Sequence, residues 1–227
     1  MSGFGRFARE NGLTLAFGTG FLLTLAGQAV AGHAELNTIL TAESLHPLSF
    51  ADYLFTSDFM VDVTENWQSE FLQFFLYIVG TVWLLQRGSP ESKSLDKAGT
   101  ESDEEQKVGA WATPDSPKSA SAGGLRQALY SRSLGIVMCL IFVLSWLAQS
   151  VTGRVAFNEE QLRDLQEPVE WPAYVASAEF WNRTLQNWQS ELLAVASMAI
   201  LAVYLRQRGS PESKPVGAAH TSTGIEG

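Results

Sequence analysis

Two short polar strings each occur twice in this chain, and they recur at the same separation. NWQSE stands at residues 66–70 and 187–191, and QRGSPESK stands at residues 86–93 and 207–214, so both recur after 121 residues. Strings that recur at one fixed separation indicate a duplicated structural unit, which constrains the fold more than any other feature. The chain is therefore expected to contain two tandem copies of one unit.

The duplication extends well beyond the two strings. A shift of 121 residues places 12–93 over 133–214 without a gap, and this match covers 82 residues. Among the identical pairs are Gly32 and Gly153, Asn37 and Asn158, and Tyr53 and Tyr174. Each copy would consist of one apolar helix, a long loop and a second apolar helix.

Each copy contains two apolar runs. Residues 13–31 and 134–151 carry no charged side chain, and the runs 71–85 and 192–205 follow the two NWQSE strings. With the turn that holds NWQSE, the latter two approach the roughly 20 residues that a membrane-spanning helix needs. The sequence therefore predicts an all-α integral membrane protein with four spanning helices, arranged as two tandem helical hairpins.

The predicted hairpins leave two other segments. The first hairpin is assigned to residues 1–93 and the second to 133–214. Residues 94–132 are expected to form a flexible cytoplasmic linker, since this region is rich in Ser, Gly, Lys, Asp and Glu and has few apolar side chains to bury. Residues 215–227 are expected to form a disordered tail.

The placement of Lys and Arg predicts the orientation. Residues 34–65 contain six acidic residues and no Lys or Arg, whereas 152–186 contain six acidic residues and three arginines. The other twelve basic residues lie near the termini, in the linker and after the second helix of each copy. Both termini and the linker are therefore expected in the cytoplasm, with both long loops outside. An even number of spans separates the copies, which predicts a parallel repeat about a pseudo-twofold axis along the membrane normal.

A cleavable signal peptide is the rival interpretation of the N-terminus. Arg6 and Arg9 precede an apolar run that ends in Ala29-Val30-Ala31, which is a pattern typical of signal peptides. The matching run at 134–151 is internal, and cleavage would leave the second copy without its counterpart. A spanning helix is therefore the favoured interpretation.

The repeated strings suggest membrane anchors. Gly88 and Gly209 suit the left-handed residue that ends a helix, and basic residues there would meet anionic lipid headgroups. Tryptophan favours the headgroup level. The predicted anchors are Trp67, Trp188, Arg87 and Arg208. The alternative for QRGSPESK is a paired recognition surface on the cytoplasmic face.

A polar cluster is predicted near the outer membrane face. It comprises Glu70, Glu191, Gln28, Gln149, Asn66 and Asn187. Residues four apart share a helix face, as Asn66 and Glu70 do. Two interpretations remain open: hydrogen bonds that cross-link the helices, or a site for a cation or proton.

The remaining composition argues against several function classes. The net charge of −9 disfavours a nucleic-acid partner. The three histidines are not placed to share a metal with a cysteine or an acid, and no cofactor motif occurs. No metal site, cofactor or catalytic residue is therefore predicted.

Helix, NWQSE, helix and QRGSPESK, occurring twice, resemble an uncharacterised bacterial family of small membrane proteins, a domain of unknown function. The resemblance covers residues 12–214 except the linker, and it implies no catalytic residue. The expected function is that of a multi-pass inner-membrane protein, not an enzyme, with a structural or partner-binding role and a membrane protein or a second copy as partner. The alternatives are a small cation channel or transporter that uses Glu70 and Glu191, and then a membrane enzyme with either as its acid or base.

Overall fold

The structure, a computed structural model, describes residues 3–225. Within that range it contains α-helices, one short 3-10 helix and no β-strand, so the predicted all-α fold is confirmed. Residues 1–2 and 226–227, the ends of the predicted first hairpin and of the predicted tail, lie outside the described residues. The helices are α1 (Gly3–Glu10), α2 (Gly12–Ala42), α3 (Phe50–Tyr53), α4 (Ser57–Gly80), α5 (Gly124–Tyr130), α6 (Ser133–Arg163), α7 (Trp171–Val175) and α8 (Ala178–Tyr204), with a 3-10 helix at Gly109–Trp111.

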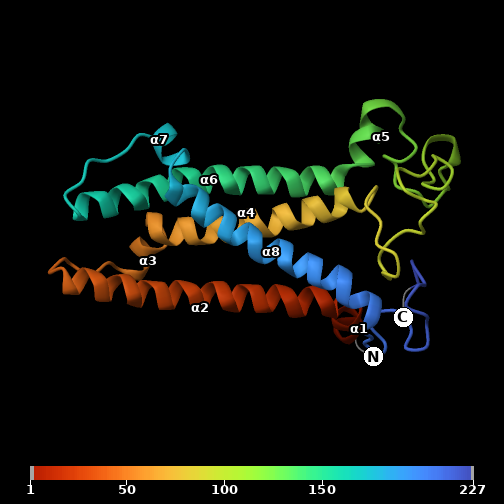
Figure 1. Cartoon of the computed structure of the whole chain (residues 1–227), viewed down its shortest axis with the longest axis horizontal. Coiled ribbons are helices and arrows are strands. Elements are labelled where there is room, and N and C mark those ends of the chain that lie inside the picture. The colour runs from red at the N-terminus through yellow and green to blue at the C-terminus, as the bar shows by residue number, and fades with distance from the viewer. Residues whose placement is uncertain (1–2, 226–227) are drawn as a thin grey trace.

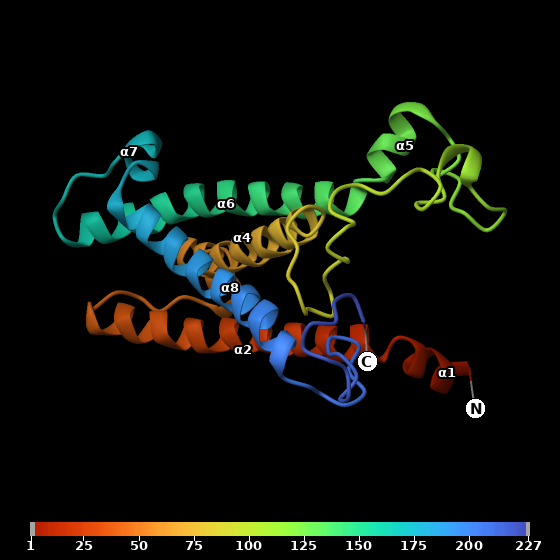
Figure 2. The ribbon, with the colours of Figure 1, turned by 45° about the vertical axis from the view of Figure 1, so that its right-hand side comes forward.

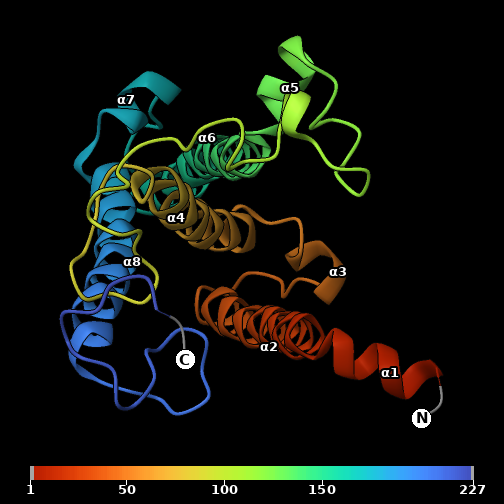
Figure 3. The ribbon, with the colours of Figure 1, turned by 90° about the vertical axis from the view of Figure 1, so that its right-hand side faces the viewer.

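The long helices α2, α4, α6 and α8 run along the long axis of the molecule. The connections that hold α3 and α7 lie together at one end, which we call the loop end (Figure 1). Helix α1, the segment between α4 and α6, and the C-terminal segment lie at the opposite, terminal end (Figure 1). Helix α8 is inclined to the other helices (Figure 2), and α4 lies between α2 and α6 (Figure 3). The two connections therefore share one end of the molecule.

Helices α4 and α8 start with the same type of cap. The Thr56 hydroxyl accepts a hydrogen bond from the Phe59 backbone N–H at 3.3 Å, and the Ser177 hydroxyl accepts one from the Phe180 N–H at 3.2 Å. Such caps satisfy backbone donors that have no partner within the helix. Helices α4 and α8 accordingly begin at Ser57 and Ala178, directly after the two capping residues.

An asparagine fixes the path of the chain after each of the helices α2 and α6. The Asn37 side chain exchanges two hydrogen bonds with the Leu48 backbone, at 2.7 and 3.0 Å. Asn158 does the same with the Val169 backbone, at 2.8 and 3.0 Å. Each pair folds the loop back against its own helix, which explains why these asparagines match in the sequence.

A buried tyrosine packs on a glycine in each half. Tyr53 is 3% exposed and Tyr174 is 1% exposed. A Cβ atom on Gly32 would collide with the Tyr53 hydroxyl, and one on Gly153 would collide with the Tyr174 hydroxyl. Only glycine therefore lets each tyrosine approach its helix.

Replacing Gly153 with alanine should destabilise the protein by about 1–3 kcal/mol, the usual cost of overpacking. The new methyl group would meet the Tyr174 hydroxyl and also lie 3.3 Å from Val61 Cγ2. Thermal unfolding in mild detergent measures the change. Adding Tyr174→Phe, which removes the hydroxyl, should restore part of the loss. Equal stability of Gly153→Ala and the wild type would contradict the packing described here.

Two of the described helices, α2 and α6, are long and apolar enough to cross a membrane. Of the apolar 18-residue stretch in each helix, only 6% in α2 and 17% in α6 is buried inside the molecule. A core helix of a soluble protein has most of such a stretch buried. The apolar faces of α2 and α6 are thus turned outward.

Helix α4 ends earlier than the sequence suggested. The predicted apolar run continues to Leu85, but α4 ends at Gly80, with Thr81 as its C-cap. Gly88 and Gly209 do adopt positive φ angles, 85° and 80°. However, they lie several residues beyond the ends of α4 and α8, so the prediction that they terminate the helices is wrong. Their left-handed conformation belongs to the loops that follow.

Candidate functional site

The most extensive helix packing in the described residues, that of α4 on α6, has a polar centre. Gln68 on α4 and Gln149 on α6 are both fully buried. Gln68 Oε1 accepts a hydrogen bond of 2.7 Å from Trp188 Nε1. Within the described residues, Gln68 Nε2 and both amide atoms of Gln149 have no hydrogen-bond partner. Most buried polar atoms are hydrogen-bonded, so this interface keeps unused hydrogen-bonding capacity.

The first half of the predicted polar cluster lies around one cavity. Gln28, Asn66 and Glu70 line a cavity of about 920 Å³ with largely apolar walls, to which α2 and α4 contribute nearly all of the lining. The Asn66 amide donates to the Asp62 carbonyl at 2.8 Å. The structure thus places the three residues around one space, but no hydrogen bond joins Gln28 to Glu70 among the described residues.

The second half of the cluster differs at its glutamine. Gln149 is buried at the interface of α4 and α6, whereas Asn187 repeats the Asn66 bond by donating to the Arg183 carbonyl at 3.0 Å. The Ser190 hydroxyl donates to Glu191 Oε1 at 3.4 Å. The two glutamines therefore differ in burial, whereas the two asparagines make equivalent hydrogen bonds. The role predicted for this cluster stays a prediction.

The predicted anchors also lie in unlike surroundings. Trp67 is 40% exposed and packs on Phe21, with ring centroids 6.3 Å apart. Trp188 packs on Phe142 and Trp146, at 6.3 and 5.6 Å, and donates to Gln68. Arg87 and Arg208 are exposed in the segments that follow α4 and α8. Their anchoring role stays a prediction.

Each QRGSPESK string folds into a closed loop of the same form. The Gln86 backbone N–H donates to the Ser92 hydroxyl at 3.0 Å, and the Gln207 N–H donates to the Ser213 hydroxyl at 2.9 Å. The second serine of each string is therefore required by the loop itself. This gives a local structural reason for the repeated serine.

The lysine of each string donates a hydrogen bond to a backbone carbonyl six residues later, which folds the intervening segment into a loop. Lys93 Nζ donates to the Gly99 carbonyl at 2.9 Å, and Lys214 Nζ donates to the His220 carbonyl at 2.9 Å. The C-terminal segment also contacts the first loop, where the Gly224 N–H donates to the Ser89 carbonyl at 3.0 Å. The disorder predicted for this tail and for the linker stays a prediction.

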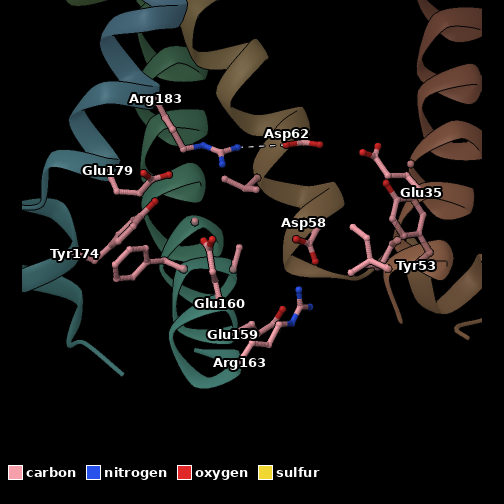
Figure 4. Close-up of a pocket in the computed structure, with 17 residues that line it drawn as sticks. Glu35, Tyr53, Asp58, Asp62, Glu159, Glu160, Arg163, Tyr174, Glu179 and Arg183 are labelled. Carbon is pink, nitrogen blue, oxygen red and sulfur yellow. Dashed lines mark hydrogen bonds and ion pairs between the residues drawn. The ribbon is translucent and has the colours of Figure 1, made fainter. Parts of the chain in front are cut away.

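A second cavity, of about 360 Å³, lies at the loop end and is strongly acidic (Figure 4). Residues of both halves line it, including the paired Tyr53 and Tyr174. Its charged residues are Glu35, Asp58, Asp62, Glu159, Glu160, Glu179, Arg163 and Arg183. With more carboxylates than guanidinium groups, the cavity attracts positive charge.

Arg183 joins the two halves at this cavity. Its guanidinium group donates to Glu65 Oε2 at 2.8 Å and to Asp62 Oδ1 at 3.4 Å. Arg183 in the second half matches the position of Asp62 in the first. The two copies therefore carry opposite charges at one equivalent position, and these charges pair with each other.

Burial changes the titration of groups around the acidic cavity. It raises the pKa of the Asp62 carboxyl above its ordinary value; the charge of Glu65 adds to this rise, and Arg183 opposes it. Burial acts to lower the pKa of Arg183, but the hydrogen bond and charge of Glu65 outweigh it and raise the pKa. Burial also raises the pKa of Tyr174 to about 12. At neutral pH the tyrosines thus contribute uncharged hydroxyls.

Sequence reasoning did not single out the acidic cavity. The available signal was the excess of acidic residues in both long loops, which was used only to orient the chain. The cavity combines side chains from α2, α4, α6 and α8, and their proximity depends on packing between the copies. No group of three or more His, Cys, Asp or Glu in residues 3–225 is placed to hold a metal ion.

The chain matches one known family. A family model described as Domain of unknown function (DUF6766) covers residues 4–225. No curated protein and no solved structure matches the chain.

Proposed function

We propose that this chain, which belongs to that family of unknown function, is a multi-pass protein of the bacterial inner membrane with a structural or partner-binding role and no enzymatic activity. In this proposal its partners are the lipid bilayer and a membrane protein or a second copy of the chain. Nucleic acid is not among them.

The membrane location is supported by the apolar residues that α2 and α6 expose. They include Leu13, Phe17, Phe21, Leu22, Leu23 and Val30 on α2, and Leu134, Val137, Leu140, Val143, Leu144, Leu147 and Val151 on α6. Soluble monomers rarely expose contiguous apolar patches of more than a few hundred Å². Lipid would cover these side chains. Helices α4 and α8, with 24 and 27 residues, also have the length to span, which favours four spans.

The duplicated hairpin is supported by contacts that recur after 121 residues. The helix caps, the asparagine–loop hydrogen bonds, the tyrosine–glycine contacts and the closed QRGSPESK loops all occur in both halves. With the acidic loop end outside and the basic terminal end in the cytoplasm, the two hairpins would be parallel.

The partner-binding role is supported by one observation above all, the acidic cavity that both halves build at the loop end. On the outer face it would receive a basic side chain of a partner protein, because the cavity has more carboxylates than arginines. Asp58 and Glu179 line it at equivalent positions, and neither carries an ion pair among the described residues.

Chemical cross-linking in intact cells tests this role. A carboxylate–amine cross-linker should join the wild-type protein to one discrete partner or to a second copy. The double variant Asp58→Asn/Glu179→Gln should lose most of this product, whereas Glu10→Gln, at the terminal end, should keep it. The role is rejected if no discrete product forms, or if the double variant and the wild type give equal yields.

A cation channel or transporter is the second candidate. It is favoured by Glu70, which lines an open cavity without a hydrogen bond among the described residues, and by Glu191, the equivalent residue of the second half. Purified protein in proteoliposomes should then conduct a monovalent cation, and Glu70→Gln with Glu191→Gln should reduce the flux at least tenfold. Absence of flux, or equal flux in the variant, would eliminate this candidate.

A further inference from the structure

The two halves differ most clearly in the space between their helices. In the first half, the cavity of about 920 Å³ lies beside Phe21, Leu25 and Trp67. In the second half, the residue equivalent to Leu25 is Trp146. The larger indole therefore stands where the first half has only an isobutyl group.

Trp146 fills the corresponding space with ring contacts. Its ring centroid lies 5.7 Å from that of Phe142, 6.1 Å from Phe180, 5.9 Å from Trp181 and 5.6 Å from Trp188. Aromatic side chains bury large areas and stabilise helix packing through such contacts. The first half has Leu25 at this position, and the space between α2 and α4 stays open there.

The walls of the cavity separate into two chemical regions. Gln28, Asn66 and Glu70 provide the polar region, and no Lys, Arg or His in residues 3–225 lines the cavity. The apolar side chains include Phe21, Leu25, Phe71 and Phe74. Phe74 lies one turn further than Glu70 from the loop end, and Phe21 lies two turns further than Gln28. The polar region thus faces the loop end and the apolar region faces the middle of the molecule.

We propose that this cavity binds one membrane phospholipid whose headgroup carries a primary ammonium, with the ammonium at Glu70 and an acyl chain beside Phe21, Phe71 and Phe74. The inference goes beyond the proposed function and rests on the membrane location given there. An outer-leaflet lipid has this polarity, with its headgroup toward the outer face and its chains toward the bilayer centre.

The hydrogen-bonding groups favour an ammonium head. Glu70 has no hydrogen bond or ion pair among the described residues, and Asn66 uses its amide nitrogen on a backbone carbonyl, which leaves its Oδ1 free to accept. A primary ammonium has three N–H donors and would find these acceptors together. The volume is at the upper end of the roughly 300–1,000 Å³ found for ligand pockets, which are typically apolar with a few polar groups.

Equilibrium binding to the full chain, followed by native mass spectrometry in mild detergent, tests the proposal. The probes are phosphatidylethanolamine and its N-acetylated form with the same acyl chains. The wild type should bind one amine lipid at least ~10-fold more tightly than the acetylated lipid, since hydrogen bonds to charged groups are worth about one to two powers of ten in affinity. Glu70→Gln should remove this preference.

Leu25→Trp should exclude both lipids, because the indole would fill the cavity as Trp146 does in the other half. Glu10→Gln, on α1 and outside the lining of the cavity, is the control and should bind like the wild type. The proposal is overturned if the acetylated lipid binds equally well, if Leu25→Trp still binds lipid while keeping its unfolding temperature, or if Glu10→Gln loses as much affinity as Glu70→Gln. Alkaline carbonate extraction of membranes from the expressing cells tests the membrane location separately. If the protein stays in the membrane but binds no lipid, only the lipid-binding proposal is rejected.

Discussion

Replacing Trp188 with alanine should destabilise the protein by about 3–5 kcal/mol, the range for removing a large aromatic side chain from a packed site. The substitution removes ring contacts with Phe142 and Trp146. It also removes the only hydrogen bond of the fully buried Gln68 side-chain amide among the described residues. An unpaired buried amide adds to the cost. The unfolding temperature in mild detergent should fall by roughly 10 °C, at about 2–4 °C per kcal/mol for a chain of this size.

Trp67→Ala provides the matched control, because Trp67 is the equivalent residue of the first NWQSE string. Trp67 is 40% exposed and has one ring contact, with Phe21. Its loss should lower the unfolding temperature less than half as far. Equal shifts for the two variants would mean that Trp188 has no special role in packing, and that both tryptophans act alike, as interface anchors.

Replacing Arg183 with aspartate should have the second largest effect, a loss of about 2 kcal/mol. The change removes charge-assisted hydrogen bonds to Glu65 and Asp62 and adds a third carboxylate beside them. Hydrogen bonds to charged groups contribute about 1.5–3 kcal/mol, and we use the lower part of that range because the Arg183 side chain is 32% exposed. Thermal unfolding at low ionic strength measures the loss.

Exchanging the two charges tests the pairing directly. The double variant Asp62→Arg/Arg183→Asp restores opposite charges across the two halves, so it should recover at least half of the lost stability. Arg163→Asp serves as control, because its ion pair with Glu43 spans 3.8 Å between exposed side chains and should contribute little. If the double variant is as unstable as Arg183→Asp alone, the proposed complementarity between the halves is wrong.

Much of the helical pattern could be predicted from local sequence. Thr56 and Ser177 mark the starts of α4 and α8, since helix caps depend only on neighbouring residues. The matched glycines and tyrosines were visible as identical pairs. Their contact was not visible, because Tyr53 meets Gly32 only after the loop has folded back on α2.

Features that depend on packing between the copies could not be predicted. Gln28 and Gln149 are equivalent residues of the two copies. Because α4 packs against α6, Gln149 is buried and Gln28 is not. The end of α4 at Gly80 was also missed, because the apolar side chains after it continue the pattern without continuing the helix. The acidic cavity is lined by side chains of four long helices, so the sequence of any one segment could not predict it.

Cysteine labelling in spheroplasts tests the central claim, that two hairpins cross the membrane with both loops outside. In a Cys139→Ser background, cysteines would be placed at Leu45 and Leu165, which are 52% and 93% exposed in the two loops, and at Ser121 in the linker. We expect an impermeant maleimide to label residues 45 and 165 on intact spheroplasts, and residue 121 only after lysis. Labelling of position 121 on intact spheroplasts, or protection of position 45 or 165 until lysis, would contradict the account.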